Sequence, residues 1–139
     1  MKKYIKQEDS MGCGIACVAY ILGISYEKAV NLFTQKQKRE TRGFTSKDIT
    51  EAIKMFSVNY KPVYVGREKE PRIENNSIVY VPKCDYFPYG HYLVKIQDGY
   101  MDPFINLHES NFDYTKAKAG LRRTLPNKIS MKIIPVPYP

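Results

Sequence analysis

The stretch from Gln7 to Cys17, QEDSMGCGIAC, places a cysteine between two glycines at the start of an apolar segment. Residues 13–22 carry apolar side chains at helical spacing and Gly23 follows as a stop, so a helix is predicted there. A thiol at Cys13 would lie at the positive end of the helix dipole, beside unpaired backbone N–H groups. Both features favour a thiolate, so the stretch is typical of a cysteine nucleophile.

The residues around this thiol suit the same chemistry. Gln7, six positions upstream, can direct its side-chain amide at a developing oxyanion, together with the backbone N–H of Cys13. Glycines leave room for a substrate backbone to approach the thiol. We therefore expect an oxyanion hole made by Gln7 and Cys13, with substrate contacts at Gly12, Gly14 and Gly90.

The first half of the chain continues with helical spacing. Ser25 can cap a second helix that runs to about Phe33. Thr45 and Asp48 form a capping-box pattern at the start of a third helix. The polar stretch between these two helices, residues 34–43, is expected to be a mobile surface loop.

From Ser57 the apolar spacing changes from near four to two, which is typical of strands. A charged, turn-prone link is expected after the first strand, a hairpin at Asp98-Gly99, and a short helix near residues 111–119. Strands are predicted over residues 58–65, 77–81, 91–96, 99–102 and 129–134. Helices first and antiparallel strands second indicate an α+β fold, with N-terminal helices packed on a C-terminal sheet. At 139 residues, a single domain over residues 1–139 is predicted.

A cysteine nucleophile needs a base, and the base needs an orienting carboxylate. His91 begins one strand of the predicted hairpin and Asp102 ends the other. A turn centred on Asp98-Gly99 leaves Asp102 near residues 94–95, so a strand twist or bulge is needed to bring it to His91. Cys13, His91 and Asp102 are thus predicted as nucleophile, base and orienting acid, in a site that needs no metal and no cofactor.

Each of these residues also has a purely structural interpretation. Cys13 fits a small core residue, His91 a half-buried strand position, Asp102 a turn cap and Gln7 a solvated loop. Their occurrence together, in this order and on these elements, favours the catalytic hypothesis.

Other residues are weaker candidates for the same roles. Cys17 shares the helix face of the nucleophile but lies inside the helix, where it is expected in the core. Cys84 is expected at the rim of the site, and His108 has no positioned carboxylate before it. Asp9 is the alternative acid, although its charge near the thiol would oppose thiolate formation.

The chain has 22 basic and 14 acidic residues, a net charge of +8. Such an excess can mark binding to nucleic acid or to an anionic surface. Basic residues gather at 36–42 and at 116–128, without a helix-turn-helix, zinc-finger or RNP-type signature. We interpret these runs as solvated faces, do not expect nucleic acid as the partner, and regard an acidic polypeptide as an equally good explanation.

The cysteine pattern and the length of the apolar runs indicate where in the cell the protein is expected. Three cysteines without a CxxC pair indicate neither a disulfide scaffold nor a zinc site. The longest apolar run, residues 15–24, is interrupted by Gly23 and is too short to span a bilayer. We expect a cytosolic protein with no membrane segment.

These motifs resemble the peptidase C39 family, papain-like cysteine peptidases that remove double-glycine leader peptides from bacteriocin and peptide-pheromone precursors. Gln7 through Gly14 is similar to the family's Gln-x5-Cys-Gly pattern. Residues 90–94 resemble its His-Tyr/Phe-hydrophobic run, and Asp102-Pro103 resembles its Asp-Pro. The likeness covers roughly residues 3–123.

The resemblance implies a papain-like fold and a Cys-His-Asp triad that works through a thioacyl intermediate. It also implies a peptide or protein substrate, cleaved after a Gly-Gly-type leader, with a narrow channel for small residues beside Cys13. An amphipathic leader helix would dock on an apolar patch away from the thiol. Domains of this family commonly precede a membrane-spanning, ATP-binding exporter, so a separate ABC exporter is an implied partner.

Two other hypotheses remain open. A deamidase, an acyltransferase or a ubiquitin-like-protein protease would use the same thioacyl chemistry, and the sequence does not separate them. A binding module that keeps these residues by descent alone is the third hypothesis, which the complete set of residues disfavours.

Overall fold

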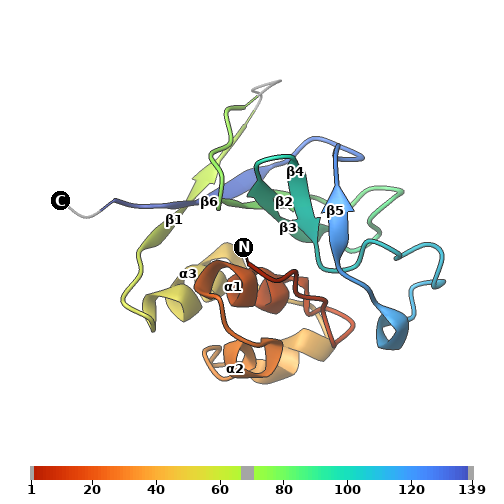
Figure 1. Ribbon diagram of the computed structural model, residues 1–139, viewed down its shortest axis with the longest axis horizontal. Coiled ribbons are helices and arrows are strands. Elements are labelled where there is room, and N and C mark those ends of the chain that lie inside the picture. Colours follow the sequence, from red (N-terminus) through yellow and green to blue (C-terminus); the bar gives the residue numbers. More distant parts are fainter. Residues whose placement is uncertain (1, 67–70, 138–139) are drawn as a thin grey trace.

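The computed structural model describes residues 2–66 and 71–137 and has two layers, with helices on one side and an antiparallel sheet on the other (Figure 1). The helical layer precedes the sheet in the chain. Its elements are α1 (Cys13–Leu22), α2 (Tyr26–Val30), the 3₁₀ turn η1 (Lys36–Glu40) and α3 (Ser46–Lys54). A second 3₁₀ turn, η2 (Tyr114–Lys116), comes later in the chain, between the last-but-two and last-but-one strands. The predicted α+β fold, with helices packed on an antiparallel sheet, is confirmed.

The sheet has six strands in the order β1-β6-β2-β3-β4-β5, and each neighbouring pair is antiparallel. The last strand of the chain therefore lies between the first two, while β5 forms an edge. The strands are β1 (Tyr60–Tyr64), β2 (Ile78–Val81), β3 (His91–Ile96), β4 (Gly99–Asp102), β5 (Gly120–Arg122) and β6 (Met131–Pro135).

Helix α1 is the centre of the helical layer. Its residues from Gly14 to Ile21 are all buried, as expected for a helix covered on every side. It ends where predicted, because Gly23 adopts a left-handed conformation with φ 68° and donates its N–H to the carbonyls of Ala19 and Tyr20. The N-terminus of α1 is therefore fixed against the sheet by a fully packed helix body.

Several predicted boundaries were wrong. Helix α2 is capped by Ser25 as predicted, but it ends at Val30 rather than near Phe33. Residues 34–43 contain η1, whose buried Lys38 pairs with Asp48 at 3.0 Å, so this stretch is anchored to α3. Strand β5 was not predicted at all. The predicted link between the first two strands falls partly outside the described residues.

Side chains of β3 alternate between two clusters. Tyr92 and Val94 belong to the core beneath the helices, whereas Leu93 belongs to a second cluster with Phe87. The site described below lies at the end of the sheet where β3 begins and β4 ends.

The β3–β4 register corrects the predicted one. Ile96 is opposite Gly99 and Val94 is opposite Met101, so the two-residue turn is Gln97-Asp98 rather than Asp98-Gly99. Asp102 is consequently level with residue 93, closer to His91 than predicted. No bulge is needed to bring the two side chains together.

Within residues 2–66 and 71–137, no helix has the length and apolar character needed to cross a membrane.

Candidate active site

Three chain segments meet around the thiol of Cys13. The N-terminus of α1 supplies the thiol, the start of β3 supplies His91, and the end of β4 supplies Asp102. A small pocket of about 110 Å³ opens at Cys13 and His91, and several aromatic side chains contribute to its wall. Its remaining lining residues are Gln7, Ser10, Met11, Phe87, Pro88, Tyr89, Gly90, Phe104, Leu107 and Phe112.

His91 and Asp102 form the central contact of the site. Nε2 of His91 lies 2.7 Å from Oδ1 of Asp102. The sheet register makes these residues diagonal neighbours, since Asp102 is level with residue 93 and His91 lies two positions before it, at the start of β3. Both side chains are buried, and the ring of Phe87 stacks on the imidazole with centroids 4.5 Å apart.

The imidazole also meets the thiol. The Cys13 thiol and the imidazole line the same pocket, and the interaction of Cys13 with His91 helps to raise the pKa of the imidazole. Burial alone would lower the pKa of His91, but the negative charge and hydrogen bond of Asp102, followed by those of Cys13, raise it above its ordinary value. The site therefore favours an imidazolium between a carboxylate and the sulfur.

Asp102 is held by more than the imidazole. Oδ1 also accepts the backbone N–H of Phe104 at 2.8 Å, and Oδ2 accepts Nε of Arg122 at 2.8 Å. Burial alone would raise the pKa of Asp102, but His91 and these hydrogen bonds lower it. Sequence reasoning missed Arg122, because the basic residues at 116–128 are interpreted there as a solvated face. A short strand with no clear apolar period gave no signal for its place.

A backbone hydrogen bond holds Gln7 beside the pocket. Its N–H donates to the carbonyl of Pro103 at 3.1 Å, which ties the N-terminal segment to the residue after Asp102. The Gln7 side chain is buried, and its Nε2 donates to the carbonyls of Asp9 at 3.0 Å and Ser10 at 3.2 Å. The predicted oxyanion donor therefore lines the pocket, but its amide hydrogens are directed at its own loop.

The start of α1 leaves its first N–H groups available. Gly12, the residue before the helix, provides no side-chain cap, and the first turn has no acidic residue. The partial positive charge at this helix end thus falls beside the thiol of Cys13.

The structure gives two of the three predicted substrate glycines another role. A Cβ at Gly12 would collide with the hydroxyl of Tyr26, and one at Gly14 would lie 3.3 Å from Ile49 Cδ1. Neither is among the lining residues of the pocket, and the small size of both serves packing, so substrate contacts at Gly12 and Gly14 stay a prediction. Gly90 does line the pocket, at a positive φ of 75°.

The weaker candidates are occupied elsewhere. The carboxylate of Asp9 accepts the hydroxyl of Tyr26 at 2.7 Å and pairs with Nε of Arg39 at 3.3 Å. Cys17 is fully buried, and burial raises the pKa of its thiol. Asp102, rather than Asp9, is therefore the carboxylate that meets the imidazole.

The two other candidate side chains lie in loops. The sulfur of Cys84 accepts the N–H of Phe87 at 3.4 Å. His108 lies 2.8 Å from the carbonyl of Tyr86 through Nε2. In the described part of the chain, no group of three or more histidine, cysteine or acidic side chains is arranged to hold a metal ion.

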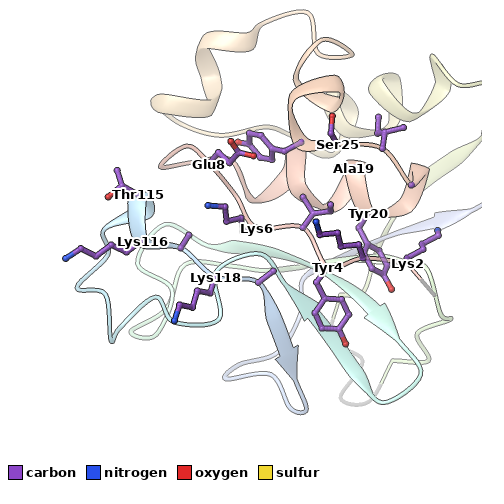
Figure 2. A pocket seen from close by; sticks show the side chains of 17 residues that line it. Lys2, Tyr4, Lys6, Glu8, Ala19, Tyr20, Ser25, Thr115, Lys116 and Lys118 are labelled. Atoms are coloured by element: carbon purple, nitrogen blue, oxygen red, sulfur yellow. The ribbon is translucent and has the colours of Figure 1, made fainter.

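A groove larger than the thiol pocket lies beside this site but does not include its reactive side chains. It has a volume of about 1160 Å³ and runs between the N-terminal segment, the α1–α2 corner and residues 115–119 (Figure 2). Lys6 and Glu8 line the groove, whereas Gln7 between them lines the thiol pocket. One extended segment thus separates the two cavities, with alternate side chains directed to each.

Comparison with known proteins identifies the family of the chain. The sequence model of the peptidase C39 family matches residues 1–101, which include Gln7, Cys13 and His91. Asp102 is the first residue after the matched range, and Arg122 lies further along the chain. No curated protein and no solved structure matches the chain. Because the match extends over well more than half of the chain, this protein belongs to the peptidase C39 family of cysteine peptidases.

Proposed function

We propose that this protein is a cysteine peptidase in which Cys13, His91 and Asp102 act as nucleophile, base and orienting acid. The observation that carries the proposal is the buried hydrogen bond between the Asp102 carboxylate and the His91 imidazole, with the Cys13 thiol lining the same pocket as that imidazole. A buried relay of this kind is how cysteine nucleophiles are activated.

The reaction follows from this geometry. The Cys13 sulfur attacks the carbonyl carbon of the scissile peptide, a C–S bond forms and the carbonyl oxygen becomes an oxyanion. The His91 imidazolium gives its proton to the leaving nitrogen, the C–N bond breaks and the acyl group remains on sulfur. Water, deprotonated by His91, then attacks the thioacyl carbon and releases the acid product, which restores the thiolate and the imidazolium.

The oxyanion is held at the start of α1. The unpaired N–H of Cys13 and the helix dipole favour negative charge at this point. Gln7 supplies the second donor when a bound substrate oxygen takes one of its amide hydrogens from the Asp9 or Ser10 carbonyl. This role predicts a small movement of the Gln7 side chain on binding.

We infer that the substrate is a peptide with small residues before the scissile bond, as in a Gly-Gly leader. The pocket beside Cys13 is small, at about 110 Å³, and so suits small residues such as glycine or alanine better than large ones. The larger groove of Figure 2 lies on the other side of the N-terminal segment, where the upstream part of the same peptide can dock as a helix. A separate ABC exporter, which would carry the cleaved product, belongs to the same proposal.

We also propose a cytosolic, papain-like peptidase with one domain over residues 1–139. The central helix carrying the cysteine, with histidine and aspartate on adjoining strands, supports the papain-like assignment. All three cysteines are free, which agrees with the reducing conditions of the cytosol. A deamidase, acyltransferase or ubiquitin-like-protein protease would use the same relay and differs only in the acceptor and the acyl donor.

The test is Cys13→Ala, compared with Cys17→Ala and Cys84→Ala as matched controls. Cys13→Ala should abolish both cleavage of a Gly-Gly-containing peptide, followed by mass spectrometry, and alkylation by iodoacetamide at pH 6. The two controls should retain both. A Cys13 thiol that reacts no faster than a free thiol at pH 6 would contradict an activated nucleophile. Loss of ammonia, or transfer of the acyl group to an amine, would instead indicate the deamidase or acyltransferase alternatives.

A further inference from the structure

The carboxylate of Asp102 has a charged partner on each side. Oδ1 lies 2.7 Å from Nε2 of His91, and Oδ2 accepts Nε of Arg122 at 2.8 Å. The Asp102 side chain is completely buried and that of Arg122 is 14% exposed. Little solvent screens this pair, so it is a strong charge-assisted hydrogen bond.

The sheet register creates this arrangement. In the β4–β5 pair, Asp102 is opposite Gly120 and Tyr100 is opposite Arg122, so Arg122 is the diagonal neighbour of Asp102. His91 is the diagonal neighbour on the other side, through the β3–β4 pair. Asp102 therefore lies on a middle strand between an imidazole and a guanidinium.

Arg122 is itself fixed in position. Its Nη2 donates to the hydroxyl of Tyr86 at 3.2 Å, and its guanidinium carbon lies 4.9 Å from the Tyr86 ring centroid. The same carbon lies 5.7 Å from the ring centroid of Phe87, the ring that stacks on His91. One loop thus packs against both partners of Asp102 and restricts their movement.

We propose that Arg122 is a positioning residue of the active site, which keeps Asp102 ionised and turned toward His91 throughout the reaction. The catalytic part of this inference rests on the proposed peptidase function. In the resting site the positive imidazolium balances the Asp102 carboxylate. When His91 passes its proton to the leaving nitrogen, that balance is lost, and a buried carboxylate without a counter-charge would be costly. Arg122 stays charged at every step and supplies the constant counter-charge.

The first test does not depend on activity. In a Cys13→Ala protein labelled with ¹³C at aspartate carboxyls, NMR titration should show the pKa of Asp102 rising when Arg122 is replaced by Gln. Arg123→Gln is the matched control, because it removes the same charge from the next, exposed residue. Arg122→Lys, which keeps the charge, should give a smaller rise and provides a second variant if the Gln form does not fold. An Asp102 titration that neither Arg122 variant moves would overturn the inference.

The second test uses peptide cleavage. Arg122→Gln should lower kcat by about 10- to 100-fold, as expected for a residue that orients a reacting group from behind, with KM changed less than about twofold. Arg122→Lys should recover part of kcat. In an Asp102→Asn background the Arg122→Gln change should have almost no further effect, because Arg122 acts through the carboxylate.

The outcomes of the two tests separate the two proposals. An equal loss of kcat in both backgrounds, or a loss confined to KM, would refute a positioning role for Arg122. A wild-type protein without Cys13-dependent cleavage or alkylation would refute the peptidase function instead. The carboxyl titration would still decide whether Arg122 sets the charge of Asp102.

Discussion

At the scale of single residues, His91 is the group whose charge connects the stability of the fold to the proposed catalysis. It is buried between the Asp102 carboxylate and the Cys13 thiol, and its pKa is raised above its ordinary value, chiefly by Asp102 acting against burial. The pKa of Asp102 is lowered, with His91 the largest favourable cause. Each group therefore stabilises the charged form of the other, and the folded state gains most where both are ionised.

This coupling predicts a pH-dependent contribution to stability. The raised pKa of His91 gives a contribution that is complete below its unfolded value of about 6.5 and is lost as pH rises through the folded value. The lowered pKa of Asp102 gives a second contribution to stability, which is complete above the ordinary pKa of a carboxyl group and is lost at lower pH. The free energy of unfolding lost in His91→Gln should therefore be largest near pH 5 to 6 and should shrink by at least about 1 kcal/mol toward pH 9.

Urea unfolding at pH 5.5, 7.5 and 9 measures this difference. His108→Gln is the matched control, because it removes the second histidine of the chain at an exposed position. A loss for His91→Gln that stays constant or grows with pH would show that the imidazolium is not stabilised in the folded protein.

At the scale of elements, the start of α1 depends on a single steric fit. Gly12 has φ −92° and ψ 9°, a conformation that alanine can adopt, but an added Cβ would collide with the hydroxyl of Tyr26. That hydroxyl donates to Asp9 at 2.7 Å and so closes the loop before the nucleophile. The absence of a side chain at Gly12 is thus a packing requirement of the element that carries the thiol.

Gly12→Ala is expected to lower the free energy of unfolding by about 1–3 kcal/mol, the usual cost of overpacking. Tyr26→Phe removes the colliding hydroxyl, after which the nearest ring carbon lies 3.2 Å from the added Cβ. The double variant should therefore lose less than the sum of the two single variants, as measured by urea unfolding. Tyr60→Phe, which removes a bonded hydroxyl at a site that does not contact Gly12, is the control and should combine additively. Additivity with Tyr26→Phe as well would contradict the steric explanation.

Local signals explain which elements could be predicted from the sequence. The capping box of α3 involves Thr45 and Asp48 only, and both reciprocal hydrogen bonds form as predicted. The bounds of β3 and β4 also agree, because a turn-forming Asp98-Gly99 pair lies at the junction of two short runs of strand-forming residues. Strand β5 has three residues and no periodic signal, and its place is set by pairing with β4. For that reason, Arg122 could not be recognised from the sequence. Its place depends on the long-range register of β5 against β4 rather than on its neighbours in the chain.

At the candidate site too, features with a local sequence pattern could be predicted, whereas long-range contacts could not. The pattern around Cys13 predicted a thiol at a helix start, and the hairpin predicted that His91 and Asp102 would lie near each other. The one-residue error in the turn separated them in the prediction, and the observed register removes that gap. The tie between Gln7 and Pro103 joins segments almost a hundred residues apart, so no local pattern could reveal it.

At the scale of the whole molecule, the net charge of +8 is distributed unevenly with respect to the two cavities. The large groove is lined by five lysines and one glutamate, Lys2, Lys3, Lys6, Glu8, Lys116 and Lys118. Among the residues that the structure describes, none of these six side chains forms an ion pair. Tyrosines contribute apolar surface between them (Figure 2). The groove therefore suits an acidic, amphipathic segment of polypeptide better than a neutral one.

If the upstream part of the substrate docks in this groove, charge reversal there should weaken binding without affecting the chemical step. Lys116→Glu combined with Lys118→Glu is expected to raise KM several-fold for a peptide with an acidic helical segment before Gly-Gly, with kcat unchanged. The reason is that these side chains lie in the groove, apart from Cys13 and its pocket. The same change should have little effect on a peptide whose upstream segment is neutral, and added salt should reduce the difference between the two peptides.

Lys47→Glu combined with Lys54→Glu is the matched control, because both lysines are exposed on α3 and neither lines the groove. This control should leave KM close to that of the unchanged protein. Equal effects of the two double variants would mean that overall charge, rather than the groove, attracts the substrate. A single-stranded oligonucleotide that competes with the acidic peptide only when Lys116 and Lys118 are intact would assign the groove to nucleic acid instead. Competition by a leader peptide lacking the scissile bond, under the same conditions, would assign it to the upstream segment of the substrate, because such a peptide can occupy the groove without being cleaved at Cys13.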